Sequence, residues 1–237
     1  MSTLSFYNEL NKRLASIESE FISKALSNNN EVDYHEERQH LMDLINATSY
    51  EELSIAKSTP ETIVSAFLDI AIFGLSICSK KQLAFIIPKF ETIFGHYCHF
   101  YIGYKGYLKL ASRNPRIKIT TSDLVYSKDA FTYNGSREYV THRTKYLSTA
   151  TRGEVMGGYC TTELTDGTVV TTVMSPEELF EIEAACRANP NSSWNSPFID
   201  EYRKKTLIRR HWKTLTTLAQ GVFDDELSNN ILRVDTY

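Results

Sequence analysis

The chain has 237 residues, of which 42% are hydrophobic, 12% aromatic and 23% charged, and its formal net charge is −3. This composition is typical of a globular protein with one large domain or two small ones, and it excludes a fibrous or disordered chain. No apolar run is long enough to cross a membrane, and the first 21 residues are too polar for a signal peptide, so we expect a soluble cytoplasmic protein.

The N-terminal region is acidic and helical by pattern. Apolar residues recur at helical spacing from Leu4 to Leu26, the polar run Asn28–Asn30 ends them, and a second helix is predicted from His35 to Asn46. Residues 1–61 carry a net charge of −6, so this end is not expected to contact nucleic acid. We assign residues 1–58 as a helical N-terminal oligomerisation segment. An ordinary solvated helical face is the alternative.

A mostly apolar helix opens the following region. Thr59 is a predicted N-cap, Pro60 occupies the first helical position, and Gly74 stops the helix after Phe73. We expect this helix to lie in the core of a functional region that spans residues 59–220.

Strand patterns dominate the middle of the chain. Asn134-Gly135 and Asp166-Gly167 are predicted hairpin turns. The fold class is therefore α+β, with N-terminal helices, a central antiparallel sheet of hairpins and a C-terminal basic helix. The predicted strands are Leu83–Pro88, Phe94–Ile102, Ile117–Tyr126, Phe131–Tyr133, Glu138–His142, Glu154–Leu164 and Thr168–Met174.

Two helices are predicted near the C-terminus. Ser175-Pro-Glu-Glu178 is a capping box that starts a helix to about Arg187. A polar loop follows, and its Trp194 either plugs the core beneath it or forms a stacking platform. The final helix runs from Phe198 to about Gln220, and residues 221–237 form a short tail.

The final helix contains a strongly basic segment. Residues 201–213 hold six Lys or Arg and one Glu, a local net charge of +5. At about 100° per residue, Lys205, Arg209 and Lys213 form one row, and apolar residues lie opposite. Residues four apart rise about 6 Å along the axis, on the order of the phosphate spacing of an extended single strand. We interpret the row as a phosphate-binding surface. The alternative is a solvated face paired to acids elsewhere.

A second basic segment lies between Cys98 and Ser122, with five Lys or Arg and no acid. Lys105, Lys109 and Arg113 repeat the four-residue spacing. Tyr104 and Tyr107 lie among them and either stack on bases or fill the core, and for Tyr107 we favour the core.

The cysteines are far apart and form no C-x-x-C pair, so buried free thiols are expected rather than a zinc site or disulfides. His96 and His99 lie in a predicted strand with side chains on opposite faces, and we predict no metal site there. The sequence has no phosphate-binding P-loop, H-E-x-x-H or G-x-S-x-G motif. Binding is therefore favoured over catalysis, and no catalytic residue is assigned.

Four blocks of the sequence, in this order and spacing, resemble the RecT family of phage-type (RecT/Red-beta-like) single-strand DNA annealing proteins. The apolar helix that ends Phe73-Gly-Leu75, followed by Leu83–Pro88, fits as well, so the resemblance covers about residues 60–218. The blocks are Cys98–Ala111 (CHFYIGYKGYLKLA), Arg152–Tyr159 (RGEVMGGY), Met174–Glu178 (MSPEE) and Tyr202–Arg210 (YRKKTLIRR).

The resemblance implies ATP-independent annealing of complementary strands in homologous recombination, in the cytoplasm of a bacterial host. It implies a ring or helical filament, single-stranded DNA and an annealed duplex intermediate as ligands, and a partner exonuclease and host single-strand binding protein. No cofactor is expected, and an effect of Mg²⁺ is left open. The candidate DNA-binding residues are Tyr104, Lys105, Lys109, Arg113, Arg152, Trp194, Lys204, Lys205, Arg209, Arg210 and Lys213.

Two features depart from the family pattern. Ser76-Ile-Cys78 stands where many members have Asp or Asn with Pro, and fewer than twenty residues follow Leu218, so contact of this tail with a partner is in doubt. The alternatives are a sequence-nonspecific single-stranded DNA or RNA-binding protein without annealing activity, a metal-dependent nuclease, and a structural assembly protein.

Overall fold

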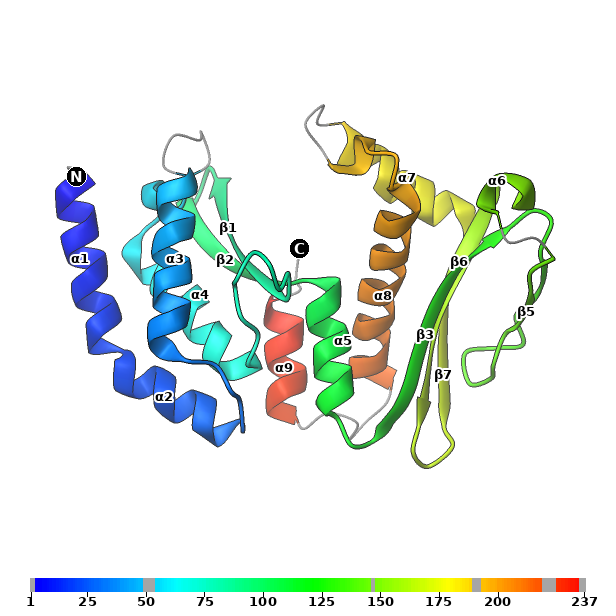
Figure 1. The fold of residues 1–237 in the computed structure, drawn as a ribbon, viewed down its shortest axis with the longest axis horizontal. Helices are drawn as coiled ribbons and strands as arrows, with labels where there is room; N and C mark the ends of the chain where they lie inside the picture. Colours follow the sequence, from blue (N-terminus) through cyan, green and yellow to red (C-terminus); the bar gives the residue numbers. More distant parts are fainter. Residues whose placement is uncertain (1–2, 49–53, 146–147, 189–192, 219–224, 235–237) are drawn as a thin grey trace. The chain divides into compact units, whose positions relative to one another are not determined.

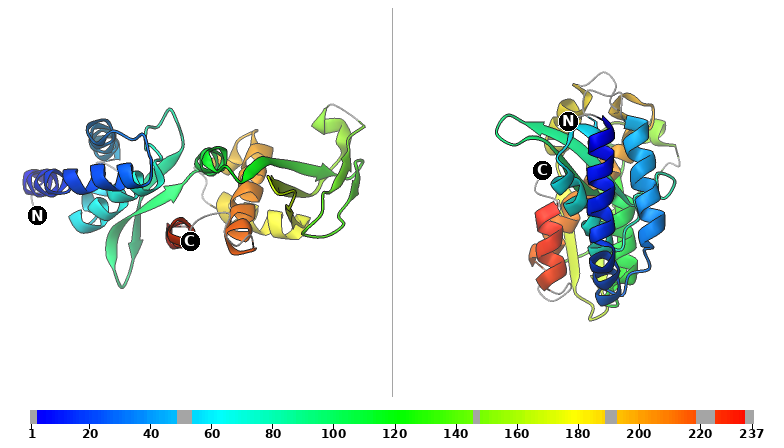
Figure 2. Two further views of the ribbon diagram at one scale, coloured as in Figure 1. Left: turned by 90° about the horizontal axis from the view of Figure 1, so that it is seen from below. Right: turned by 90° about the vertical axis from the view of Figure 1, so that its left-hand side faces the viewer.

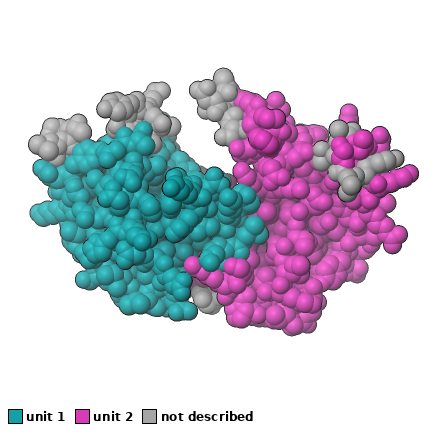
Figure 3. Space-filling view, viewed as in Figure 1, with its two compact units in different colours: residues 1–109, 229–237 teal, residues 110–228 magenta. Residues whose placement is uncertain are grey.

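The computed structural model describes residues 3–48, 54–145, 148–188, 193–218 and 225–234. The chain forms two compact units (Figure 3). Unit 1 contains residues 1–109 and 229–237, and unit 2 contains residues 110–228. The boundary at residue 109 lies inside the region that the sequence assigned to one core, residues 59–220.

Unit 1 begins with helices, as the apolar spacing predicted. The single run predicted from Leu4 to Leu26 is interrupted at Ile17, which leaves two helices, and the acidic side chains of Glu18 and Glu20 lie in the first turn of the second. Acids there interact favourably with the helix dipole. The helices are α1 (Thr3–Ser16), α2 (Glu18–Ser27), α3 (Tyr34–Thr48), the 3-10 helix η1 (Ile55–Lys57) and α4 (Pro60–Phe73).

Helix α4 confirms the predicted boundaries. Gly74 ends it in the left-handed conformation, with φ of 61°. Thr59 stands at the N-cap, but its side chain makes no capping hydrogen bond. The side-chain amide of Asn30 donates to the carbonyls of Ala71 and Ile72 at 2.8 and 2.9 Å. It thereby satisfies acceptors that the helix end leaves without intrahelical partners.

The hairpin of β1 (Ala84–Glu91) and β2 (Gly95–Ile102) is a two-stranded sheet of its own in unit 1. The prediction of one central sheet is therefore wrong in this respect. Alternate residues face α4, where Phe100 stacks on Phe73 at a centroid distance of 5.4 Å. The far end of the hairpin projects beyond the helices of unit 1 (Figure 2).

A three-stranded antiparallel sheet forms the centre of unit 2, in the order β3-β6-β7. Asp166-Gly167 makes the predicted turn between β6 and β7, and Gly167 has φ of +84°. The strands β3 (Ile117–Tyr126), β6 (Val155–Leu164) and β7 (Val169–Met174) agree with the predicted ranges to within one residue at each end.

The two-stranded ribbon of β4 (Ala130–Thr132) and β5 (Thr141–Arg143) corrects a prediction. Thr132 pairs with Thr141, so residues 133–140 form a loop and Asn134-Gly135 is not a tight hairpin turn. Thr171 of β7 draws this loop in, because its amide donates to the Ser136 carbonyl and its hydroxyl to the Glu138 carbonyl, at 2.8 and 2.7 Å. These bonds to another strand override the local turn signal.

Helices cover the face of the β3-β6-β7 sheet that lies opposite the β4–β5 ribbon (Figure 1). Because side chains alternate across a strand, Gly158 and Thr162 of β6 face α8 whereas Tyr159 stacks on Phe131 of the ribbon. Ser175 and Glu178 form the predicted capping box. The remaining elements are α5 (Tyr104–Arg113), α6 (Thr149–Arg152), α7 (Pro176–Arg187), the 3-10 helix η2 (Ser193–Asn195), α8 (Ile199–Leu218) and α9 (Asp225–Val234).

Helix α9 was not predicted from the sequence. Its last residues belong to unit 1, where Arg233 pairs with Asp69 and the Nε2 of His99 donates to the Val234 carbonyl at 2.8 Å. In the part of the chain that is described, no helix is long and apolar enough to cross a membrane. All four cysteines are free thiols; Cys98 and Cys160 are buried, whereas Cys78 and Cys186 are only half-buried.

Candidate nucleic-acid surface

Helix α8 is fixed to the sheet by one apolar side, as its spacing predicted. Leu207, Ile208 and Leu215 are buried, and α8 contacts β3, β6 and β7. The opposite side of the helix, which bears most of the cations, is therefore held in a fixed orientation.

A buried histidine adds polar links to this packing. The Nε2 of His211 hydrogen-bonds the Thr162 hydroxyl of β6 at 2.8 Å, and its Nδ1 hydrogen-bonds the Thr172 hydroxyl of β7 at 2.9 Å. Burial lowers the pKa of His211 to about 4, so the ring is neutral at pH 7. His211 therefore anchors α8 and adds no charge to the surface.

The structure sorts the cations of α8 into three groups. Arg203 is internal, because its guanidinium bonds Glu183 of α7 and Asp200 at 2.7–2.9 Å. Its charge joins the two helices and is neutralised there, so it is not a candidate contact.

Lys204 and Arg210 form the second group. Lys204 pairs with Asp123 of β3 at 3.2 Å, and Arg210 pairs with Glu178 of α7 at 3.5 Å. Both pairs are partly exposed, so their net stabilisation is small and a polyanion can compete for the cations. The alternative of pairing to acids elsewhere thus holds for part of the helix.

Lys205, Arg209 and Lys213 form the third group, which is the predicted row. All three side chains are partly exposed. The Nζ of Lys205 lies 4.1 Å from the ring centre of Tyr202, a favourable cation–π contact. Arg209 is close enough to Cys186 to oppose the rise that burial causes in the pKa of that thiol. Arg209 thus lies near α7, the helix that contains Cys186.

An aromatic pair stands at the start of the row. The rings of Trp194 and Tyr202 are 5.6 Å apart, and Trp194 is half-buried, so it keeps an accessible surface. Tyr202 was not predicted as a site residue. The signal was present in the sequence, because Trp194, Phe198 and Tyr202 follow one another at intervals of four residues. Phe198 is 70% exposed.

Arg152 has an internal position, unlike the other candidates. Its guanidinium donates to both carboxylate oxygens of Asp129 at 3.0 and 2.5 Å and to the Leu124 carbonyl, and it lies over the ring of Tyr126. The bond from Arg152 holds the pKa of Asp129 well below its usual range. The side chain is buried, so its role here is structural and we remove it from the candidate surface.

The residues predicted on α5 form a separate set. Tyr107 is buried, as expected, whereas Tyr104 and Lys105 are half-exposed. Lys109 and Arg113 are exposed. Tyr104, Lys105 and Lys109 belong to unit 1, whereas Arg113 belongs to unit 2, which also contains α8.

The sequence has known relatives. The sequence matches the RecT family over residues 36–231, most of the chain and all of α8. The chain belongs to the RecT family. It is 28% identical over 158 residues to Protein RecT of Escherichia coli (strain K12), an alignment that covers 65% of this chain and 57% of that protein. The chain therefore spans little more than half the length of this relative.

Close contacts explain glycines in two of the blocks that resemble the RecT family. A Cβ on Gly106 would lie 2.2 Å from the Leu83 carbonyl, and one on Gly158 would lie 2.4 Å from the Leu207 side chain. These distances are far below van der Waals contact. The glycines let α5 approach the start of β1 and let α8 approach β6, so they set the positions of both basic helices.

The segment in which this RecT-family chain departs from the common pattern is well anchored. The Glu37 carboxylate, 2% exposed, accepts from the Ile77 amide at 2.9 Å, and the Ser76 hydroxyl accepts from the Cys78 amide at 3.1 Å.

Among the described residues, no three His, Cys, Asp or Glu side chains are grouped as metal ligands would be.

Proposed function

We propose that this RecT-family chain is an ATP-independent single-strand DNA annealing protein that acts in homologous recombination. The observation that carries the proposal is the row Lys205, Arg209 and Lys213, which lies on the side of α8 opposite the residues that fix the helix to the sheet. Family membership and the resemblance of the sequence blocks support the same function.

Two complementary strands repel one another through their phosphates, and each strand also folds on itself. Cations that neutralise phosphates along one strand reduce the repulsion, and binding to an extended strand leaves its bases available for pairing. The row spans about 12 Å of helix, since eight residues each rise about 1.5 Å. It therefore meets about three consecutive phosphates of an extended strand.

The aromatic pair supplies the second kind of contact. Trp194 and Tyr202 lie beside Lys205, so a base can stack on an aromatic face while its phosphate meets the lysine. Stacking accepts every base, and backbone contacts carry no sequence information. This combination suits annealing, which must work on any sequence.

The wider functional unit is an assembly in this proposal. Copies of the chain form a ring or helical filament, with residues 1–58 at the interface, and their basic surfaces hold single-stranded DNA and then the annealed duplex intermediate. A partner exonuclease supplies the single strand and a host single-strand binding protein covers it, in the bacterial cytoplasm. The chain acts without a cofactor or a catalytic site of its own.

Neutralising the row tests the phosphate contacts. Lys205→Gln with Arg209→Gln is expected to weaken binding to all sequences alike and to flatten the slope of log affinity against log salt by about 1.4, which is about 0.7 for each lost contact. The control is Lys128→Gln with Arg143→Gln, which removes the same charge from exposed side chains outside residues 1–58 that are not candidate contacts. Slopes that match between the two variants would refute the assignment.

An annealing assay separates the proposal from its alternatives. Two complementary strands that carry a donor and an acceptor dye are mixed with and without the protein, and energy transfer is followed without ATP. The proposal requires faster pairing. Binding without acceleration would instead indicate a nonspecific single-stranded DNA or RNA-binding protein, and shortened strands in the presence of Mg²⁺ would indicate a nuclease.

A further inference from the structure

In unit 1 a positively charged stretch of sequence follows the acidic helices. Residues 1–61 have a net charge of −6, whereas residues 74–109 contain five lysines and one glutamate, a net charge of +4. Two of these lysines, Lys80 and Lys81, occupy an exposed turn between α4 and β1. None of the contacts assigned so far uses them.

The turn that carries these lysines is closed and fixed at both ends. The amides of Lys81 and Gln82 donate to the Cys78 carbonyl at 2.9 and 3.2 Å, and Gln82 takes a left-handed conformation with φ of 55°. The buried carboxylate of Glu37 holds the entry to the turn through the Ile77 amide. The lysines are therefore presented from a defined backbone.

Helix α5 adds a third cation to this turn. The Nζ of Lys105 donates to the side-chain carbonyl of Gln82 at 2.9 Å. Glycine is needed just before this helix, because a Cβ on residue 103 would lie only 2.8 Å from the Gln82 carbonyl. The Gly103 amide also donates to the Leu83 carbonyl at 2.9 Å. Lys105 thus reaches the turn that contains Lys80 and Lys81.

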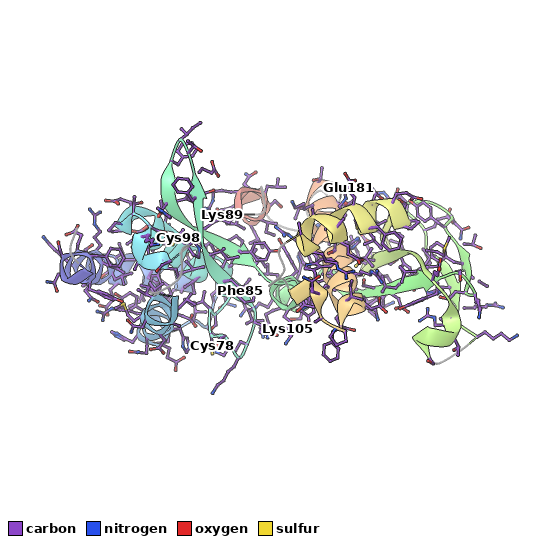
Figure 4. All side chains as sticks on the ribbon, turned by 90° about the horizontal axis from the view of Figure 1, so that it is seen from above. Cys78, Phe85, Lys89, Cys98, Lys105 and Glu181 are labelled. Carbon is purple, nitrogen blue, oxygen red and sulfur yellow. The ribbon has the colours of Figure 1, made fainter. Side chains whose placement is uncertain are left out.

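Two aromatic rings lie next to these cations. Phe85 of β1 pairs with Tyr101 of β2 on the outer face of the hairpin, with ring centres 6.5 Å apart. Phe85 is 39% exposed, and its ring would lie 3.0 Å from a Cβ on Gly103. Figure 4 shows Cys78, Phe85 and Lys105 close together where the hairpin meets the start of α5, with Lys89 farther along the hairpin.

We infer that unit 1 has a single-stranded DNA contact of its own, in which Phe85 and Tyr101 stack against a base and Lys80, Lys81 and Lys105 bind the adjoining phosphates. The inference rests on the proposed function and extends it to residues outside α8. Cations around an exposed aromatic pair are the combination that binds a single strand without reading its sequence.

The lysines and the ring are tested separately in the full chain. Lys80→Gln with Lys81→Gln is expected to flatten the salt slope for single-stranded DNA by about 1.4 relative to the control Lys128→Gln with Arg143→Gln. Phe85→Leu removes stacking but keeps an apolar side chain, and it is expected to weaken binding about fivefold with an unchanged slope. Phe85→Tyr should restore the affinity.

The matched aromatic control is Tyr133→Leu, which removes an equally exposed ring from unit 2. Circular dichroism and the melting temperature establish that each variant is folded. An unchanged slope for the double lysine variant, or a loss of affinity for Phe85→Leu no greater than for Tyr133→Leu, would overturn the inference. If this occurs while the α8 double variant still loses its salt slope, the proposed function stands and only the contact on unit 1 is refuted.

Discussion

His211 makes the folded protein sensitive to moderate acid. Its ring is 0% exposed, hydrogen-bonds Thr162 and Thr172, and has a pKa of about 4 instead of 6.5. Above pH 6.5 the ring is neutral in both the folded and the unfolded state. Between pH 6.5 and about 4 the unfolded chain binds a proton that the folded protein does not, so the free energy of unfolding falls as the pH falls.

The size of the effect follows from the two pKa values. They differ by about 2.5 pH units, and each unit corresponds to about 1.4 kcal/mol, so His211 alone removes about 3 kcal/mol of stability between pH 7.5 and pH 4. This is a large share of the total stability of a typical protein, which is about 5–15 kcal/mol.

The variant His211→Gln isolates this contribution, because an amide side chain donates and accepts hydrogen bonds but does not titrate. Urea unfolding is followed by tryptophan fluorescence, because Trp212 of α8 is completely buried in the folded protein. At pH 7.5 the variant is expected to be less stable by about 1 kcal/mol, the usual net value of one hydrogen bond. At pH 4 this deficit should be replaced by an advantage, because only the wild type has lost about 3 kcal/mol.

Parallel stability curves for the two proteins between pH 7.5 and pH 4 would refute this reasoning. A direct control is the NMR titration of the His211 ring protons in the folded protein. A midpoint near 6.5 would show that the ring is protonated without cost and that the burial described here is wrong.

Three further predictions concern the packing of unit 2 and the thiols. Asp129→Asn is expected to lower the free energy of unfolding in urea by about 3–5 kcal/mol, because the buried guanidinium of Arg152 loses its charge partner. The stability that Asp129 contributes is present at neutral pH and declines as the pH falls below the ordinary pKa of 3.8. A loss under 1 kcal/mol would contradict this account. Gly158→Ala should cost about 1–3 kcal/mol, since the added methyl group overlaps Leu207, and an unchanged urea midpoint would argue against the close contact. Iodoacetamide at pH 8 should modify the half-buried thiols of Cys78 and Cys186 well before the buried thiols of Cys98 and Cys160, as followed by peptide mass spectrometry. Burial raises the pKa of Cys98 to about 11 and that of Cys160 to about 12.

The secondary structure followed closely from local chemistry. The capping box at Ser175, the stop at Gly74 and the alternation in β3 depend on residues within a few positions of one another, and the structure confirms them. The turn at Asn134-Gly135 failed because bonds from Thr171, far along the chain, hold the loop instead. A turn predicted from local sequence does not form where groups far along the chain make hydrogen bonds with the same segment.

Only part of the candidate nucleic-acid surface could be predicted from the sequence. Helical spacing gave the row on α8 and the buried side that carries His211. It did not distinguish Lys205 from Arg203, since the partner of Arg203 is Glu183, twenty residues earlier on another helix. Arg152 was included because of the block that contains it, yet its position is set by Asp129 in a loop after β3.

The sequence by itself determined the family, the α+β class, the limits of most elements and the concentration of positive charge on two helices, because spacing and charge are properties of neighbouring residues. Only the tertiary structure decided which of those charges are neutralised internally, that the sheets are separate, and that Lys105 and Phe85 lie beside the turn that contains Lys80 and Lys81. Those outcomes depend on contacts between segments far apart in the chain, for which no spacing rule exists.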